Sequence, residues 1–419
     1  MSARLPDGDP VPRDGALPET ALVDLGARPF GVYVHVPFCA TRCGYCDFNT
    51  YTAAELEPGA QARGARRSRA GYLAAAHAEL ALARRVLGDG APRVETVFFG
   101  GGTPTLLAPT ELAALLRAIE ETFGLAPGTE VTTEANPESV DPASLAALRA
   151  AGFTRISLGM QSAASHVLAT LDRVHTPGRA AQAAHEARAA GFAHVSLDLI
   201  YGTPGESDDD WRASLDAALA AEPDHVSAYA LIVEPGTRLA AQIAHGAIAA
   251  PDDDTLADRY ELADAALRDA DFDWYEISNW ARSPDVACRH NVGYWRGGDW
   301  WGIGPGAHSH VGGVRWWNAL HPSAYVAHLA EGASPAAGRE LLDAETRRVE
   351  RVMLELRLAD GLPLEVLDKA GRAAAVQAAD DGLATLADDR IRLTLRGRLL
   401  ADAVVRSLLG WAAPQPPGA

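Results

Sequence analysis

Short apolar runs alternate with amphipathic, Ala/Leu-rich stretches over the first two-thirds of this 419-residue chain. The predicted strands lie at 31–36, 94–99, 130–134, 155–159, 195–200 and 225–231, with predicted helices at 72–87, 109–123, 142–151, 180–190 and 208–221. Strands and helices that alternate at this spacing indicate βα units with parallel strands. Six such units predict an α/β fold, a (β/α)6 partial TIM barrel, with functional side chains at the carboxyl ends of its strands.

Composition divides the chain into five predicted parts. Residues 1–28 are rich in Pro and Gly and lack periodicity, so we expect a disordered N-terminal tail. The barrel follows over 29–270, and an aromatic-, Gly- and His-rich connecting region over 271–340. A small helical, winged-helix-like domain with a strand at 390–395 and a helix at 397–408 occupies 341–410, before a tail at 411–419.

Charge and hydropathy limit the partners and the location of the protein. The net charge is −18, and apart from one arginine run at 63–69, interpreted as a solvated loop, no basic face for nucleic acid is visible. No apolar run reaches the roughly 18 residues of a membrane-spanning helix. The first 20 residues also lack the apolar stretch of a signal peptide. We therefore expect a cytoplasmic protein without a transmembrane segment, and peripheral contact with the inner face of a membrane stays open.

Three of the four cysteines, Cys39, Cys43 and Cys46, form a C-x3-C-x2-C cluster directly after the first predicted strand. Clustered thiols in a reducing compartment indicate metal binding, not disulfides. Structural zinc sites need four protein ligands in short spacings, and the fourth cysteine, Cys288, is far away in the chain. Three thiolates fit a [4Fe–4S] cluster with one open iron. Zinc and unligated thiols are the weaker alternatives.

A glycine triplet, Gly100–Gly102, followed by Thr103, ends the second predicted strand. Glycines let a ligand approach the backbone closely and leave N–H and C=O groups free to contact it. A tight turn is the alternative interpretation. The predicted position beside the cysteine loop favours a ligand site.

Together these motifs resemble the radical S-adenosylmethionine (SAM) superfamily. The blocks 33–39, 100–105, 155–162 and 198–205 narrow the resemblance to the group of the oxygen-independent coproporphyrinogen III oxidases, over residues 30–408. This resemblance implies a barrel of the radical SAM type that binds a [4Fe–4S] cluster and SAM. The positions that it implies for SAM contact are Tyr33, Tyr45, Gly101, Gly102, Thr103, Glu134, Gln161, Arg173 and Asp198.

The chain departs from those oxidases at one position near the cluster. The oxidases carry a further Cys two residues after the third ligand, where this chain has Phe48. The blocks 275–279, 290–295 and 302–309 instead resemble the haem chaperone branch of the group. That branch implies haem binding and delivery of haem to haem-dependent proteins, with membrane-bound respiratory enzymes among the candidate acceptors and an electron donor for the cluster. Oxidative decarboxylation of coproporphyrinogen propionates is the first alternative, and a radical SAM enzyme with another substrate, such as a haem-modifying methyltransferase, is the second.

The segment at 275–317 is crowded with aromatic residues, as a flat apolar ligand would require. These aromatic residues are Tyr275, Trp280, Tyr294, Trp295, Trp300, Trp301, Trp316 and Trp317. His290 is the first candidate for an axial haem ligand, His308 the second, and Cys288 a thiolate alternative. Ordinary core packing of the aromatic residues is the competing interpretation.

Overall fold

A computed structural model describes residues 5–56, 69–173 and 176–412. The barrel is built on six parallel strands in chain order: β1 (Phe30–Val36), β2 (Val94–Gly101), β3 (Leu125–Ala135), β4 (Arg155–Gln161), β5 (His194–Tyr201) and β6 (His225–Ala230). The predicted α/β fold with six βα units is therefore confirmed. The arginine run at 63–69, except Arg69, and residues 413–419 of the predicted tail lie outside the described ranges.

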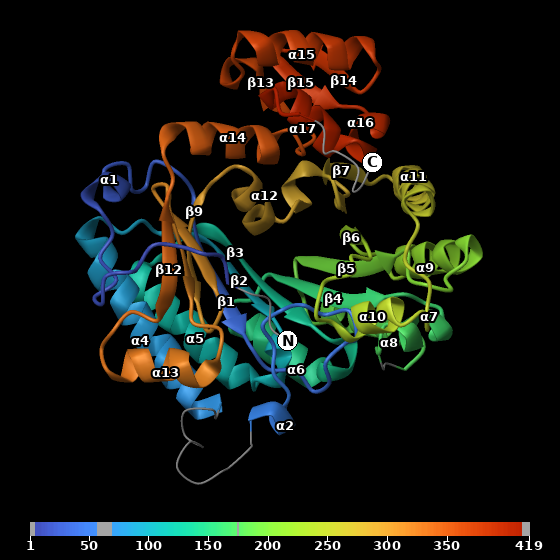
Figure 1. Cartoon of the computed structure of the whole chain (residues 1–419). Coiled ribbons are helices and arrows are strands. Elements are labelled where there is room, and N and C mark those ends of the chain that lie inside the picture. Colours follow the sequence, from blue (N-terminus) through green and yellow to red (C-terminus); the bar gives the residue numbers. More distant parts are fainter. Residues whose placement is uncertain (1–4, 57–68, 174–175, 413–419) are drawn as a thin grey trace.

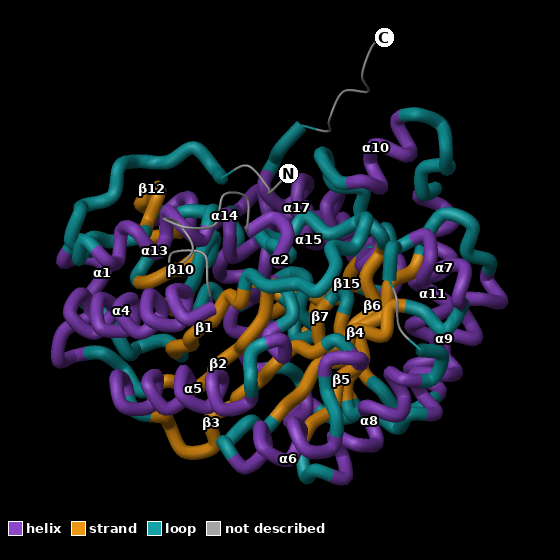
Figure 2. The backbone as a smooth tube through the Cα atoms, turned by 90° about the horizontal axis from the view of Figure 1, so that it is seen from below, coloured by secondary structure: helices purple, strands orange, loops and turns teal. Residues whose placement is uncertain are grey.

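Helices cover the outer face of these strands (Figures 1 and 2). The larger ones are α4 (Arg69–Leu87), α5 (Pro109–Phe123), α6 (Pro142–Ala150), α8 (Arg179–Ala189), α9 (Asp208–Ala220) and α11 (Asp253–Asp269). Outward residues such as Val34 and Leu197 are buried against apolar helix faces that include Ala83 and Leu215. Each fully buried Val or Leu contributes about 1.5–3 kcal/mol. Among the described residues, no helix is long and apolar enough to cross a membrane.

The inner face of the same strands carries mostly polar side chains, because successive residues in a strand alternate between faces. The strand register places Thr132 of β3 beside Arg155 of β4, and Glu134 beside Ser157. Asp198 of β5 follows at the level of Gly159. These side chains line a cavity inside the barrel, so the register fixes their order along its length.

Six further strands widen the sheet on both sides. β9 (Asp299–Ile303) pairs parallel with β1, and β10 (His308–Val311), β11 (Val314–Asn318) and β12 (Ala336–Leu341) continue antiparallel; β8 (Asn279–Ala281) and β7 (Asp273–Glu276) follow β6. Shorter helices complete this part of the chain: α2 (Ala53–Leu56), α7 (Ser165–Thr170), α10 (Arg238–Ala244), α12 (Arg289–Trp295) and α13 (Pro322–Ala330). The expected connecting region at 271–340 thus contributes all six of these additional strands.

The expectation of a disordered tail at 1–28 is wrong for residues 5–28. The backbone of Asp9 forms two hydrogen bonds with Arg339 of β12 (2.8 and 3.0 Å), and the short helix α1 (Glu19–Leu22) buries Ala21. Gly8 packs on the Trp317 ring, where a Cβ would lie 2.5 Å from the ring. An extended Pro/Gly-rich segment has no periodicity of its own, but it can still cover a sheet edge.

The C-terminal domain is a small helical unit on a three-stranded antiparallel ribbon. It contains α14 (Ala344–Glu355), β13 (Leu362–Pro363), α15 (Lys369–Asp380), β14 (Ala384–Ala387), β15 (Arg390–Leu393), α16 (Leu395–Leu399) and α17 (Ala401–Leu409). Val352, Leu367, Ile391 and Val405 belong to its own apolar core. Figure 1 shows this domain above the barrel, next to α12 and β7.

Candidate functional site

The cysteine loop follows β1 and rests on two turns from the second half of the chain. These turns, at Pro305 and Leu320, form the floor of the loop. Asn49 donates its side-chain amide to the carbonyl oxygens of Pro305 (2.9 Å) and Leu320 (2.7 Å). Tyr51 donates its hydroxyl to Asn49 Oδ1 (3.0 Å) and accepts the backbone N–H of Cys39 at its carbonyl (3.0 Å). The end of the loop after Cys46 is therefore held by the turns that follow β9 and β11, and its two ends are joined to each other.

The three cysteines of the loop line the barrel cavity and are free thiols. Arg173 approaches Cys43, with its Nη1 3.7 Å from the sulfur. No three His, Cys, Asp or Glu side chains within the described ranges converge closely enough to hold a single metal ion. A [4Fe–4S] cluster instead spreads its thiolates over three irons, with a fourth iron left open. The donor set, three thiolates in one loop, fits such a cluster.

The glycine triplet lies directly against the cysteine loop. Gly102 donates its N–H to Val36 O (2.8 Å) and Thr103 donates to Phe38 O (2.7 Å). A Cβ at Gly102 would lie 2.4 Å from Phe38 O, and Gly101 has φ +105°. Glycine is thus required here by the contact between the two loops. Both loops still line the cavity, so the predicted ligand contact is also possible.

Two acidic side chains meet in the cavity, as predicted from their positions at strand ends. Glu134 Oε2 accepts the N–H of Gly101 (3.1 Å), and both Asp198 oxygens accept from the Ser157 hydroxyl (2.9 Å each). Burial, with the nearby Asp198 charge, raises the pKa of Glu134 to about 8. Burial also raises the pKa of Asp198. Two desolvated carboxyl groups favour a cationic ligand, and SAM carries an ammonium and a sulfonium.

Gln161 and Arg173 close the same end of the cavity. Gln161 has φ +64°, a left-handed conformation at a bulge in the β4–β5 pairing. Such strain in a non-glycine residue is typical of functional positions. Arg173 donates through Nη2 to Gly159 O (2.8 Å). This hydrogen bond holds the guanidinium beside the cysteine loop.

All the residues predicted for the cluster and for SAM line this one cavity of about 860 Å3. The tyrosines take part as well: Tyr33 hydrogen-bonds His35 (3.0 Å) and stacks on Phe98, and Tyr45 lies beside the cysteines. Ligand sites occupy about 300–1,000 Å3, so this cavity is near the upper end of the range.

Sequence reasoning missed the group that holds α12 across the inner end of the cavity. The buried carboxylate of Glu130 accepts the backbone N–H groups of Arg289 (3.2 Å) and His290 (3.0 Å) and pairs with Arg155 Nε (3.3 Å). Cys288 donates its thiol to the same carboxylate (3.5 Å). A Glu in one predicted strand and an Arg in the next could have indicated this ion pair. Only the fold shows that the pair anchors α12.

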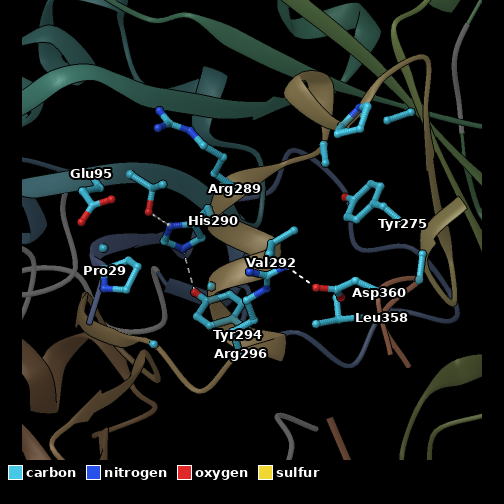
Figure 3. Close-up of a pocket in the computed structure, with 18 of the residues that line it drawn as sticks. Pro29, Glu95, Tyr275, Arg289, His290, Val292, Tyr294, Arg296, Leu358 and Asp360 are labelled. Carbon is cyan, nitrogen blue, oxygen red and sulfur yellow. Dashed lines mark hydrogen bonds and ion pairs between the residues drawn. The ribbon is translucent and has the colours of Figure 1, made fainter. Parts of the chain in front are cut away.

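His290 lies on α12 with both ring nitrogens engaged (Figure 3). A hydrogen bond joins Nδ1 to the Thr96 hydroxyl (2.8 Å) and another joins Nε2 to the Tyr294 hydroxyl (2.9 Å). The ring stacks on Phe98 with 5.2 Å between centroids. Burial lowers the pKa of His290 to about 4, so the imidazole is neutral at physiological pH. His290, Tyr275 and Tyr294 line the barrel cavity and also a second cavity on the other side of α12.

This second cavity, of about 900 Å3, lies between the amino ends of β1 and β2, α12 and the C-terminal domain (Figure 3). Aromatic and aliphatic faces dominate its wall: Phe30, Trp274, Tyr275, Val292, Tyr294, Trp300 and Leu358. Four arginines also line it: Arg28, Arg289, Arg296 and Arg392. Arg296 bridges to Asp360 of the C-terminal domain at 2.8 Å, so the two parts of the protein share this cavity.

The sequence left two interpretations of the aromatic segment, a site for a flat ligand and ordinary core packing, and each holds for some of its residues. Trp280, Trp301, Trp316 and Trp317 are buried in the protein core, as ordinary packing predicts. Other aromatic residues line the second cavity, as described above. His308 lies on β10, tilted against Trp317, away from both cavities. Cys288 lines the barrel cavity, where burial raises its pKa to about 12.

The barrel, the three-cysteine loop and the adjoining glycine loop define a radical SAM protein. Residues 33–218 match the model of the Radical SAM superfamily and residues 342–400 that of the HemN C-terminal domain. Heme chaperone HemW of Mycobacterium tuberculosis (strain H37Rv) is 58% identical over 389 residues, which cover 93% of this chain and 97% of that protein. Heme chaperone HemW of Bacillus subtilis is 31% identical, over 90% of this chain and 98% of that protein. The chain belongs to the HemW family of radical SAM proteins.

A solved structure supports the fold. Coproporphyrinogen III oxidase (HemN) from Escherichia coli superposes with a TM-score of 0.77 at 22% identity, covering 93% of this chain and 92% of that chain. At this identity the likeness establishes the architecture alone. Membership of the radical SAM superfamily implies a [4Fe–4S] cluster and SAM, in agreement with the donor set described above.

Proposed function

We propose that this protein is a haem chaperone, which binds haem and passes it to haem-dependent proteins. The names of its relatives point to this activity. The observation on this chain that carries the proposal is the second cavity, a largely apolar space of about 900 Å3 with an imidazole in its wall. Haem needs flat apolar faces and an axial donor, and this cavity offers both.

Charged groups around the cavity suit the two carboxylates of haem. Arg289, Arg296 and Arg392 line it, and guanidinium groups bind carboxylates through paired hydrogen bonds. Arg296 is held by Asp360 at 2.8 Å, an exposed pair that a ligand carboxylate can replace at small cost.

His290 is the proposed axial ligand. Its neutral imidazole is the form that binds a metal. Coordination requires one ring nitrogen to give up its hydrogen bond, to Thr96 or to Tyr294. Loading of haem is therefore coupled to a change in α12 or its neighbours.

The barrel cavity would hold the cofactors on the far side of α12. We propose that Cys39, Cys43 and Cys46 bind the [4Fe–4S] cluster, with SAM held by Tyr33, Tyr45, Gly101, Gly102, Thr103, Glu134, Gln161, Arg173 and Asp198. A reduced cluster held by these cysteines would supply an electron to the bound SAM. An electron donor and haem acceptors that include membrane-bound respiratory enzymes follow from the same family resemblance. We also propose a cytoplasmic site of action.

The oxidase alternative differs at the mouth of the barrel cavity. Phe48 stands where the oxidases carry a further Cys, and its side chain is 59% exposed at that mouth. The resemblance to the solved oxidase concerns the fold alone.

The test is an anaerobic haem titration of the cluster-loaded protein, followed in the Soret band. We expect saturation near one haem per chain and an altered spectrum for His290→Ala. His308→Ala is the matched control, because His308 lies away from both cavities, and its titration should equal that of the wild type. Absence of saturable binding would refute the chaperone proposal, and turnover of coproporphyrinogen would be measured next.

A further inference from the structure

The inner end of the barrel cavity contains two buried polar groups that no protein atom satisfies. Arg155 is 1% exposed and Thr132 is fully buried, and both line the cavity. Arg155 Nη1 and Thr132 Oγ1 have no hydrogen-bond partner. The two residues are register neighbours on β3 and β4, so their unsatisfied groups belong to one place in the barrel.

Arg155 also keeps part of its positive charge uncompensated. Its Nε pairs with Glu130 and its Nη2 donates to the carbonyl of Val286, which leaves Nη1 free. Glu130 distributes its negative charge over further donors, the thiol of Cys288 and the backbone amides of α12. A buried donor without a partner costs about 1–3 kcal/mol, and more when it is charged. An incoming oxyanion would remove this cost.

Near Arg155, the buried His225 does not compete with the guanidinium for binding of an oxyanion. His225 hydrogen-bonds Ser196 (2.7 Å) and Tyr275 (2.8 Å) through its two nitrogens. Burial and the positive charge of Arg155 hold the pKa of His225 well below its usual value, so this ring adds no second cation. The site presents one charged donor and one hydroxyl.

The place is separate from Glu134 and Asp198, the two acidic positions assigned to SAM. Arg155 precedes Ser157, the neighbour of Glu134, by two residues, and it lies four residues before the level of Asp198. Two residues of strand span about 6.6 Å, so Arg155 lies roughly 7–13 Å deeper in the barrel. Phe98 and Tyr33 stand at the register level of Thr132 and also line the cavity, where their rings suit an aliphatic chain. The Tyr33 hydroxyl reaches from this level toward the SAM end, where it hydrogen-bonds His35 (3.0 Å).

We propose that the inner end of the barrel cavity binds the carboxylate of a small aliphatic acid, through Arg155 Nη1 and Thr132 Oγ1, while SAM occupies the outer end. Such a ligand extends its aliphatic part toward the level of Glu134 and Asp198. This places a small organic acid in the chamber where a SAM-derived radical would form. The proposal does not rest on haem binding, which concerns the cavity on the other side of α12.

The test uses butyrate and its neutral isostere butyramide as probes. Saturation-transfer NMR on the butyrate methyl group, with cluster-loaded protein at saturating SAM and constant ionic strength, should give saturable binding of one butyrate per chain. Butyramide should not bind. Thr132→Val should weaken butyrate about tenfold, the effect of losing one hydrogen bond to a charged group. This variant should fold normally, because the hydroxyl that it removes has no partner in the protein.

Two variants complete the design. Thr133→Val is the matched control: Thr133 is also buried on β3, but it is the next residue and therefore faces away from the cavity, so butyrate affinity should not change. Arg155→Lys should abolish binding, with cluster absorbance and circular dichroism as checks on the fold. Absence of saturable butyrate transfer, equal binding of butyramide, displacement by SAM, or unchanged affinity in Thr132→Val would each overturn the proposal. The haem titration is independent of all four results.

Discussion

SAM binding should be linked to the ionisation of Glu134. The pKa of this carboxyl is about 8 in the ligand-free protein, so it is mostly protonated at neutral pH. An ionised Glu134 can pair with the ammonium of SAM, and a protonated one cannot. We therefore expect SAM affinity to rise with pH over the range in which Glu134 loses its proton.

The size of the effect follows from the two ionisations. About 1% of Glu134 is ionised at about pH 6 and about 24% at about pH 7.5. An α-amino group with a pKa near 7.8 keeps about two-thirds of its charge at the higher pH. The product of these two fractions, ionised Glu134 and charged amino group, predicts that the affinity for SAM rises about 15-fold from about pH 6 to about pH 7.5. At higher pH the amino group loses its charge and the affinity falls again. Isothermal titration calorimetry in buffers of different ionisation enthalpy should also detect proton release on SAM binding near pH 7.

Glu134→Gln separates this linkage from a loss of fold. The variant should bind SAM weakly, with little change in affinity below about pH 7. The folded protein keeps the proton on Glu134 up to about pH 8, whereas the unfolded chain loses it above about pH 4.5. The free energy of unfolding of the ligand-free protein therefore falls as pH rises from about 4.5 to about 8. Gln removes that cost, so the variant should be no less stable at pH 8. A flat affinity profile in the wild type, or the same rise in the variant, would contradict the reasoning.

Two further predictions concern the cluster and α12. Replacement of any one of the three loop cysteines by Ser should abolish the cluster absorbance near about 400 nm after anaerobic reconstitution, whereas Cys288→Ser should retain it. An intact cluster in all three loop variants would refute the ligand assignment. Glu130→Ala leaves Arg155 without its ion-pair partner and α12 without its anchor, so the free energy of unfolding should fall by about 3–5 kcal/mol in denaturant titrations; a change below about 1 kcal/mol would contradict this role.

Local patterns were sufficient for the six barrel strands and for the grouping of the predicted site residues around one cavity. Each βα unit carries its own apolar strand and amphipathic helix, and parallel strands bring their carboxyl ends together. Glu134 and Asp198 are far apart in sequence, yet this rule alone predicts that they meet. The structure places both in the same cavity.

The remaining parts depend on long-range contacts that have no local pattern. β9 is a short strand with two tryptophans, and its pairing with β1 is visible only in the fold. The role of Glu130 depends on α12, which lies about 160 residues later in the chain. The second cavity needs the C-terminal domain for part of its wall, so no single segment of sequence could predict it.

The floor beneath the cysteine loop has a consequence for synthesis of the protein. Asn49 reaches its carbonyl partners across separations of 256 and 271 residues. At roughly 5–20 residues per second, translation leaves the cysteines outside the ribosome for about 13–54 seconds before that floor exists. During this interval the thiols sit on an unsupported loop, open to oxidation or to the wrong metal. Stable insertion of a cluster is therefore expected only after Leu320 has been made and the loop has its support.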